Sequence, residues 1–110
     1  MPVTAVVSIL HRVSGIVLFL SIPYIVWLLS LSVKSPAGFN EVVAIFDTGL
    51  GKLTNIVLLW AVIHHFFAGL RFLLLDMDIG IQRETAIKMA WLVNIVVFVV
   101  LVFLVIRVVL

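Results

Sequence analysis

Long apolar stretches without charge dominate the chain and determine its predicted secondary structure. Asp, Glu, Lys and Arg are absent from Val13–Val33, Leu53–Leu70 and Met89–Ile106. A helix needs about 20 mostly apolar residues to cross the roughly 30 Å of hydrocarbon in a bilayer. The first stretch has this length alone, and the other two reach it with their flanking residues. The pattern therefore predicts transmembrane helices over residues 5–33, 52–76 and 85–109.

We expect an all-α protein, an integral membrane bundle of three transmembrane helices in one domain over residues 1–110. The apolar stretches lack the alternation of apolar and polar residues that the strands of a membrane barrel show. The composition agrees, because 65% of the residues are hydrophobic and 11% are charged. A soluble domain of this length cannot bury that much apolar surface, so the lipid bilayer is the expected partner of most side chains.

Charge and cysteine content narrow the chemistry. The formal net charge is +2 and no basic run is present, so nothing indicates a nucleic-acid partner. The chain has no cysteine, which leaves its three histidines as the best ligands for a transition metal.

The two connections contain the turn-forming residues and most of the charges. In the first, Ser35-Pro36-Ala37-Gly38 is typical of a turn, and Phe39–Phe46 is predicted to lie along the membrane interface. Basic residues slightly favour a cytoplasmic N-terminus. In that orientation the cytoplasmic side holds Arg12, Arg71, Arg83 and Lys88, and the other side holds Lys34, Lys52 and Arg107.

Polar residues gather where the first predicted helix begins and the second ends, which is the same side of the membrane. On the first helix Ser8, Arg12 and Gly15 share one stripe, with His11 beside them. Ionisable residues inside membrane spans are costly and are usually functional. We therefore expect a functional site where the two helices meet.

On the second helix His65 and Gly69 are four residues apart and share a face. Glycine leaves room beside the imidazole for a flat macrocycle. With Asp76 at the interface, His65 lies about 16 Å deeper, near the middle of the bilayer. His11 is expected nearer the surface. Adjacent His64 points about 100° away from His65, so the two cannot be ligands on opposite sides of one metal.

These residues resemble two motifs of the cytochrome b556 subunits of succinate dehydrogenase. The first motif, S-x-x-H-R-x-[ST]-G, is matched by Ser8, His11, Arg12, Ser14 and Gly15. The second, H-x-x-x-G-x-R followed by an apolar run and Asp, is matched by His65, Gly69, Arg71 and Asp76. Either motif alone is weak, but the ordered pair is fairly specific. Some family members have a second histidine where this chain has Phe72.

The resemblance implies roles for particular residues. His65 would be an axial ligand of the iron of haem b, and Ser8 and Arg12 would help to form a ubiquinone site. His11, Arg12 and Arg71 would hold the haem propionates. The second axial ligand would come from another chain.

The resemblance also implies a respiratory complex in which this chain is an anchor that does not itself oxidise succinate. Its partners would be a flavoprotein subunit, an iron–sulfur subunit and a second membrane anchor. Electrons would pass from the iron–sulfur subunit to ubiquinone, in the tricarboxylic acid cycle and the respiratory chain. We expect a multi-pass protein of the bacterial cytoplasmic (inner) membrane.

Simpler interpretations stay open at this point. His65 can be a structural histidine, Arg12 and Arg71 can extend to the lipid headgroups, and Ser8 can bond to its own helix. The glycines of both motifs can serve close helix packing alone. For the whole chain, the alternatives are an anchor of a quinol:fumarate reductase and a three-helix membrane scaffold without cofactor.

Overall fold

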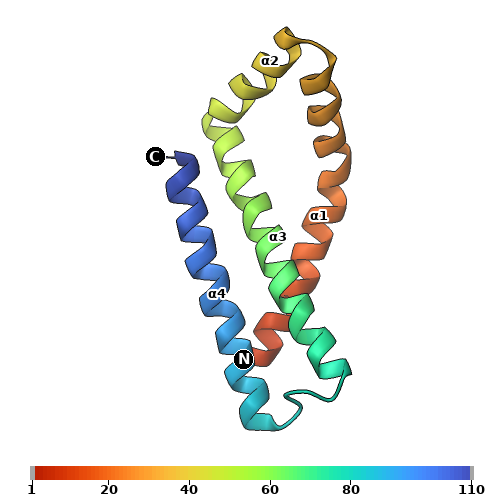
Figure 1. Ribbon diagram of the computed structural model, residues 1–110, viewed down its shortest axis with the longest axis vertical. Helices are drawn as coiled ribbons and strands as arrows, with labels where there is room; N and C mark the ends of the chain where they lie inside the picture. The colour runs from red at the N-terminus through yellow and green to blue at the C-terminus, as the bar shows by residue number, and fades with distance from the viewer. Residues whose placement is uncertain (1, 110) are drawn as a thin grey trace.

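A computed structural model describes residues 2–109, and within this range the protein is all-α, which confirms the predicted fold class (Figure 1). The helices are α1 (Val3–Lys34), α2 (Pro36–Asp47), α3 (Gly49–Asp76) and α4 (Arg83–Val109). Three of them, α1, α3 and α4, are long and apolar enough to cross a membrane. They begin at Val3, Gly49 and Arg83, rather than at the predicted residues 5, 52 and 85.

The first connection differs from the prediction, because the expected turn at residues 35–38 is the start of helix α2. Ser35 is the N-cap of α2, and its hydroxyl oxygen accepts a hydrogen bond from the backbone nitrogen of Gly38 at 2.9 Å. Pro36 follows at the first helical position, where proline needs no backbone donor. Both residues favour turns and helix starts alike, which is why the sequence pattern misled.

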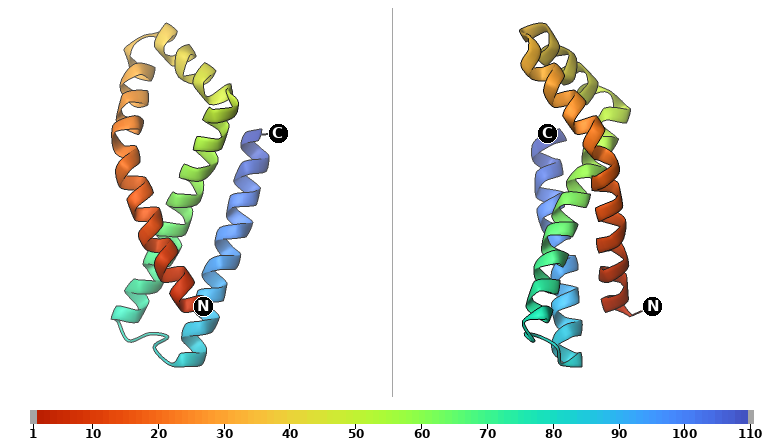
Figure 2. Two further views of the ribbon diagram at one scale, coloured as in Figure 1. Left: turned by 180° about the vertical axis from the view of Figure 1, so that it is seen from behind. Right: turned by 90° about the vertical axis from the view of Figure 1, so that its right-hand side faces the viewer.

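The molecule is an elongated bundle of 54 × 27 × 21 Å. Helix α2 joins α1 to α3 at one end, and the N-terminus lies near the other end, with the loop between α3 and α4 (Figures 1 and 2). The contacts of α3 with both α1 and α4 make it the central helix of the bundle. A short core holds the three long helices together. It consists of Val7, Ile63, Ala68, Ala90, Val93 and Val97.

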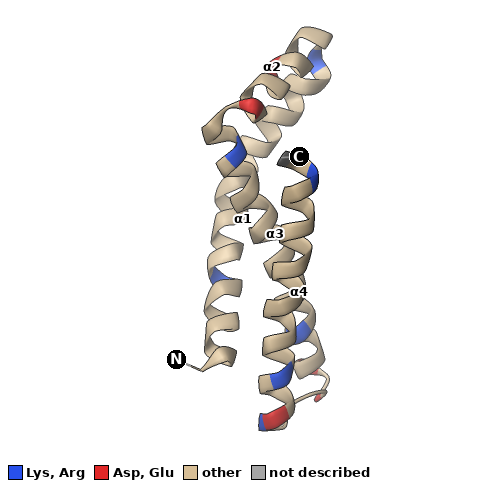
Figure 3. Ribbon diagram, turned by 90° about the vertical axis from the view of Figure 1, so that its left-hand side faces the viewer, with Lys and Arg blue, Asp and Glu red and all other residues tan. Residues whose placement is uncertain are grey.

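Most large apolar side chains face outward. Phe19 is 72% exposed and Phe98 67% exposed, as expected for helices whose outer surface meets lipid. Most charged residues lie towards the two ends of the bundle, and one basic position of α1 lies further inside it (Figure 3). The fold thus places the polar residues of the N-terminal part of α1 beside those of the C-terminal half of α3.

Candidate functional site

The imidazole of His65 on α3 is held against α1 through its Nδ1 atom. Nδ1 lies 3.2 Å from the carbonyl oxygen of His11 and 3.2 Å from the Ser14 hydroxyl oxygen. The carbonyl can only accept a hydrogen bond, so we assign the proton to Nδ1. The Ser14 hydroxyl in turn donates to the same carbonyl at 2.7 Å, which leaves its oxygen free to accept from Nδ1. In this tautomer the lone pair of the ring is on Nε2.

The Nε2 atom of His65 has no hydrogen-bond partner among residues 2–109. The buried side-chain nitrogen and oxygen atoms without a partner in this range are limited to Nε of Arg71. Nε2 therefore keeps access to the surface of the chain. A neutral imidazole with one nitrogen hydrogen-bonded and the other accessible is the form that binds metals.

His11 lies at the same depth as His65, which differs from the expectation that it is nearer the surface. The two rings are stacked with centroids 4.2 Å apart and planes 8° from parallel. Phe72 packs against the ring of His11, with centroids 5.0 Å apart. The crossing of α1 and α3 decides this arrangement, and positions along either helix alone do not reveal it.

The two motif glycines each lie against a histidine ring, and the space beside them is filled by these rings. A Cβ atom on Gly15 would lie 3.1 Å from Cε1 of His65, closer than side chains normally pack. A Cβ on Gly69 would lie 3.6 Å from Nε2 of His11, an ordinary contact. The imidazole of His11 thus fills the position next to Gly69 that we expected a macrocycle to use. Gly15 is the glycine on which the placement of His65 depends.

His64 turns to a different part of α1. It is 1% exposed, its Nε2 lies 3.5 Å from the carbonyl oxygen of Val7, and its ring stacks on Trp60 with centroids 5.6 Å apart. This is the packing expected of a structural histidine. It agrees with the interpretation that His64 and His65 do not bind one metal together.

Ser8 and Arg12 lie on the surface of α1 near the histidines in sequence. Arg12 is exposed and Ser8 is half-buried. Four other serines of α1, namely Ser14, Ser21, Ser30 and Ser32, donate to the carbonyl three residues before them. Ser8 makes no such bond within the described residues, so its hydroxyl stays available for another partner.

Arg71 has its hydrogen-bond partner on α4, and its guanidinium lies 5.8 Å from the ring of Phe72. It is 5% exposed, and one of its terminal nitrogens lies 3.5 Å from the carbonyl oxygen of Ala86 on α4. The structure therefore does not bring it together with His11 and Arg12 as one cluster. The role as a propionate partner that the resemblance implied for Arg71 stays a prediction.

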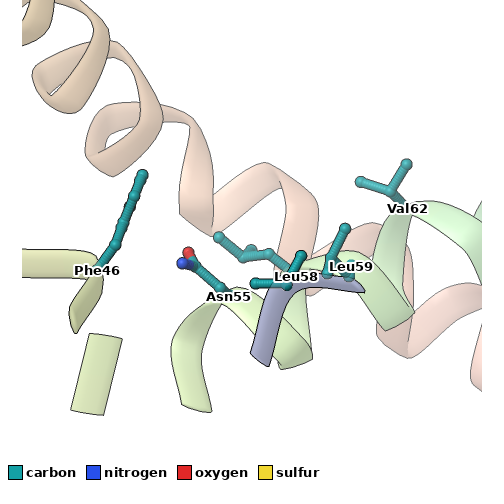
Figure 4. Close-up of a pocket in the computed structure, with 6 residues that line it drawn as sticks. Phe46, Asn55, Leu58, Leu59 and Val62 are labelled. Carbon is teal, nitrogen blue, oxygen red and sulfur yellow. The ribbon is translucent and has the colours of Figure 1, made fainter. Parts of the chain in front are cut away.

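A cavity lies along α3 between the histidines and α2, and its lining residue Val62 precedes His64 by two positions. It has a volume of about 430 Å³ and is lined by Phe46, Asn55, Leu58, Leu59, Val62 and Val108. Figure 4 shows the side chains of Phe46 and of the α3 residues around it. None of these side chains is titratable, so this cavity offers no acid or base.

Sequence reasoning gave no role to Ser14 or Phe72. Ser14 is fully buried and contacts His65, and Phe72 packs on His11. The motif contained Ser14, but a serine within a helix normally bonds to its own backbone, and this one does so as well. Only the approach of α3 shows that its oxygen also faces His65.

These features define a class of protein: a multi-pass helical membrane protein with a pair of histidines clamped between two of its spans. Residues 1–105 match the family described as Succinate dehydrogenase/Fumarate reductase transmembrane subunit. The chain belongs to this family.

Two relatives agree, and both bear the name succinate dehydrogenase cytochrome b556 subunit. The protein from Paracoccus denitrificans is 34% identical over 88 residues, which cover 80% of this chain and 68% of the relative. The protein from Coxiella burnetii is 38% identical over 77 residues, which cover 69% of this chain and 62% of the relative. The chain is thus similar to a membrane subunit of an enzyme complex over most of its length.

Proposed function

We propose that this chain binds haem b and anchors a succinate:quinone oxidoreductase in the membrane, where it helps to form the ubiquinone-reduction site. The observation that carries the proposal is the state of His65. Its Nδ1 is hydrogen-bonded inside the bundle, and its Nε2 has no partner among the described residues. Support also comes from the family and from the two relatives, whose names include cytochrome b556.

The residues fit haem with His65 as one axial ligand. Histidines that bind metals commonly donate their other ring N–H to a carbonyl or carboxylate, which orients the ring and makes the ligand more basic. The His11 carbonyl and the Ser14 hydroxyl supply this support to His65. Haem supplies one-electron chemistry, and the protein sets its position, ligands and surroundings.

The second axial ligand comes from another chain in this proposal. The imidazole of His64 contacts the Val7 carbonyl through Nε2 and stacks on Trp60. His11 stacks directly on His65 at 4.2 Å, which leaves no space for a macrocycle between the two rings. A second membrane-anchor subunit is therefore the expected source, on the side that Nε2 of His65 faces.

Ser8 and Arg12 form the quinone-binding part of the proposal. Quinone carbonyls accept hydrogen bonds, and both an unbonded hydroxyl and an exposed guanidinium can donate them. His11 and Arg12 are also the proposed propionate partners. His11 stacks on His65, and Arg12 is its exposed neighbour on α1. Arg71 is the least supported of the three because its guanidinium faces α4.

The complex proposed for this anchor contains a flavoprotein that oxidises succinate, an iron–sulfur subunit and a second anchor. Electrons pass from the iron–sulfur subunit to ubiquinone beside the haem, in the tricarboxylic acid cycle and the respiratory chain. We place the protein in the bacterial inner membrane with a cytoplasmic N-terminus, so that the polar cluster of α1 faces the soluble subunits.

The haem proposal is tested with the purified complex carrying His65→Ala. We expect the haem b absorption spectrum to be lost or strongly changed, because the iron loses a ligand. His65→Met, which keeps a possible ligand, should retain haem with a shifted spectrum. Phe66→Ala changes an exposed neighbour on α3 and should leave the spectrum unaltered. An unchanged spectrum in His65→Ala complex with all its subunits would show that another residue binds the iron.

The quinone proposal is tested by comparing two electron acceptors. Ser8→Ala and Arg12→Leu should slow ubiquinone reduction by succinate much more than reduction of an artificial dye that accepts electrons from the soluble subunits. Ser30→Ala changes an exposed serine of α1 far from the polar cluster and serves as the control. If both acceptors are affected equally in Ser8 and Arg12 variants, these residues do not contact quinone.

Two alternative functions can each be distinguished from the proposal by a simple measurement. A quinol:fumarate reductase anchor is within the same family, and the preferred direction of electron flow in the purified complex separates it from the proposal. A scaffold without cofactor predicts a colourless preparation. A reduced-minus-oxidised spectrum of the complex extracted intact in detergent distinguishes it at once.

A further inference from the structure

A second polar feature of the bundle lies between α3 and α4, away from the histidines. Arg71 follows His65 by six residues, which turns it by about 120° around the axis of α3. His65 contacts α1, and Arg71 contacts Ala86 of α4. The proposed haem and quinone functions make little use of this face of α3.

The guanidinium of Arg71 is poorly satisfied for a buried cation. The side chain is 5% exposed, and its Nε atom is buried with no hydrogen-bond partner. Its partners within the described residues are two neutral groups, the carbonyl oxygen of Ala86 at the long distance of 3.5 Å and the ring of Phe72, whose centroid lies 5.8 Å from Cζ. Burying an uncompensated charge is expensive, so an anion from outside these residues is expected beside Arg71.

The surroundings of Arg71 are apolar and open to the lipid. A groove of about 250 Å³ runs between α3 and α4 beside it. Its other lining residues are Phe67, Leu70, Leu74, Met89, Leu92, Val93 and Val96. Several of them face outward, including Leu70 at 42% and Leu92 at 59% exposure. A basic group at one point of a narrow hydrocarbon groove matches an amphiphile with an anionic head.

We propose that this groove binds one anionic phospholipid, with the phosphate on Arg71 and an acyl chain between α3 and α4. Arg71 is five residues from Asp76 at the end of α3, or about 7.5 Å along the helix. A long side chain at that depth can reach the headgroup region. A guanidinium donates well to phosphate oxygens, and a flexible acyl chain conforms to the groove as a rigid protein surface would not. This assignment replaces the propionate role that the resemblance implied for Arg71, and it does not depend on haem or quinone.

The test uses the complete complex in lipid nanodiscs of phosphatidylcholine with a minor share of phosphatidylglycerol that carries a photoreactive diazirine on its acyl chain. After illumination, the labelled residues are mapped by mass spectrometry. We expect labelling at Leu92, which lines the groove deeper in the span than Ala86, well above labelling at Trp91, its neighbour on α4 with a similar exposed fraction (59% and 55%). Unlabelled phosphatidylglycerol should displace the probe, and added phosphatidylcholine should displace it much less.

Arg71→Gln should lower labelling of the groove about tenfold, the loss expected when one charge-assisted hydrogen bond is removed. Lys88→Gln removes an exposed charge of α4 at the same end and should leave the labelling unchanged. If the Arg71 variant does not assemble, the comparison of Leu92 with Trp91 in the natural complex still tests the proposal.

Three results would overturn the proposal. Equal labelling of Leu92 and Trp91 would indicate ordinary surrounding lipid. Absence of label from the groove, with a protein subunit crosslinked there instead, would indicate a partner carboxylate on Arg71. A changed haem spectrum in Arg71→Gln with unchanged lipid labelling would assign the guanidinium to a haem propionate.

Discussion

At the scale of single residues, Ser14 links the backbone of α1 to the ring of His65. Its hydroxyl donates to the His11 carbonyl and lies within hydrogen-bond distance of Nδ1. Both acceptors of the Nδ1 proton thus belong to one turn of α1. Any change in this turn is expected to act on the orientation and basicity of the imidazole.

Ser14→Ala removes one of these two acceptors while the helix continues undisturbed. Loss of such an outer contact typically weakens metal binding about 10- to 100-fold. We expect weaker haem retention and a shifted midpoint potential in a redox titration of the complex. Ser21→Ala, which removes a serine bond of the same kind deeper in α1, should leave the potential unchanged. Equal potentials in both variants would show that the Ser14 contact does not influence the haem.

Gly15 is a second residue on which the site depends. In Gly15→Ala the new methyl group would meet the His65 ring at 3.1 Å, so the ring or helix α1 must move. Overpacking of this kind costs about 1–3 kcal/mol. We expect a perturbed haem spectrum and a lower unfolding temperature of the complex. Gly49→Ala, where a Cβ would meet nothing, is the control.

At the scale of elements, helix α3 presents different chemistry on each of its faces. His65 faces Ser14 of α1, His64 faces Val7, and Arg71 faces α4. Successive residues rotate by about 100°, so neighbours in sequence serve different contacts. The helix can do this only because small residues such as Ala61 and Ala68 let the other helices approach closely.

Ala68→Leu tests this dependence on close packing. Ala68 is fully buried in the core, so the larger side chain must push α3 away from its neighbours. We expect a fall in the thermal stability of the detergent-solubilised complex and loss of haem in parallel. Val62→Leu enlarges a residue of α3 that is 53% exposed and should change neither property. Similar stability of the two variants would mean that the core tolerates wider spacing.

At the scale of the whole molecule, the distribution of basic residues favours a cytoplasmic N-terminal end by a small margin. The absence of cysteine makes a direct test simple. With Gln82→Cys, in the loop between α3 and α4, we expect reaction with a membrane-impermeant maleimide only from the cytoplasmic side. Ala37→Cys, at the start of α2, should react only from the opposite side. The reverse pattern would invert the proposed orientation.

The number and type of the spanning helices could be predicted from the sequence, because length and hydrophobicity are local properties that lipid selects directly. The start of α2 could not, since Ser35 and Pro36 suit a turn and a helix N-terminus equally well. The same limit applies to the site. Its residues were found from two motifs, but their partners were not.

What the sequence determined by itself was the set of spans and the choice of polar residues near one membrane surface. Only the tertiary structure decided that the ring of His11 lies against that of His65, and that Arg71 turns towards Ala86. The reason is geometric. A residue's position gives its direction on its own helix, whereas the rotation and crossing of two helices depend on packing between them, which no single helix contains.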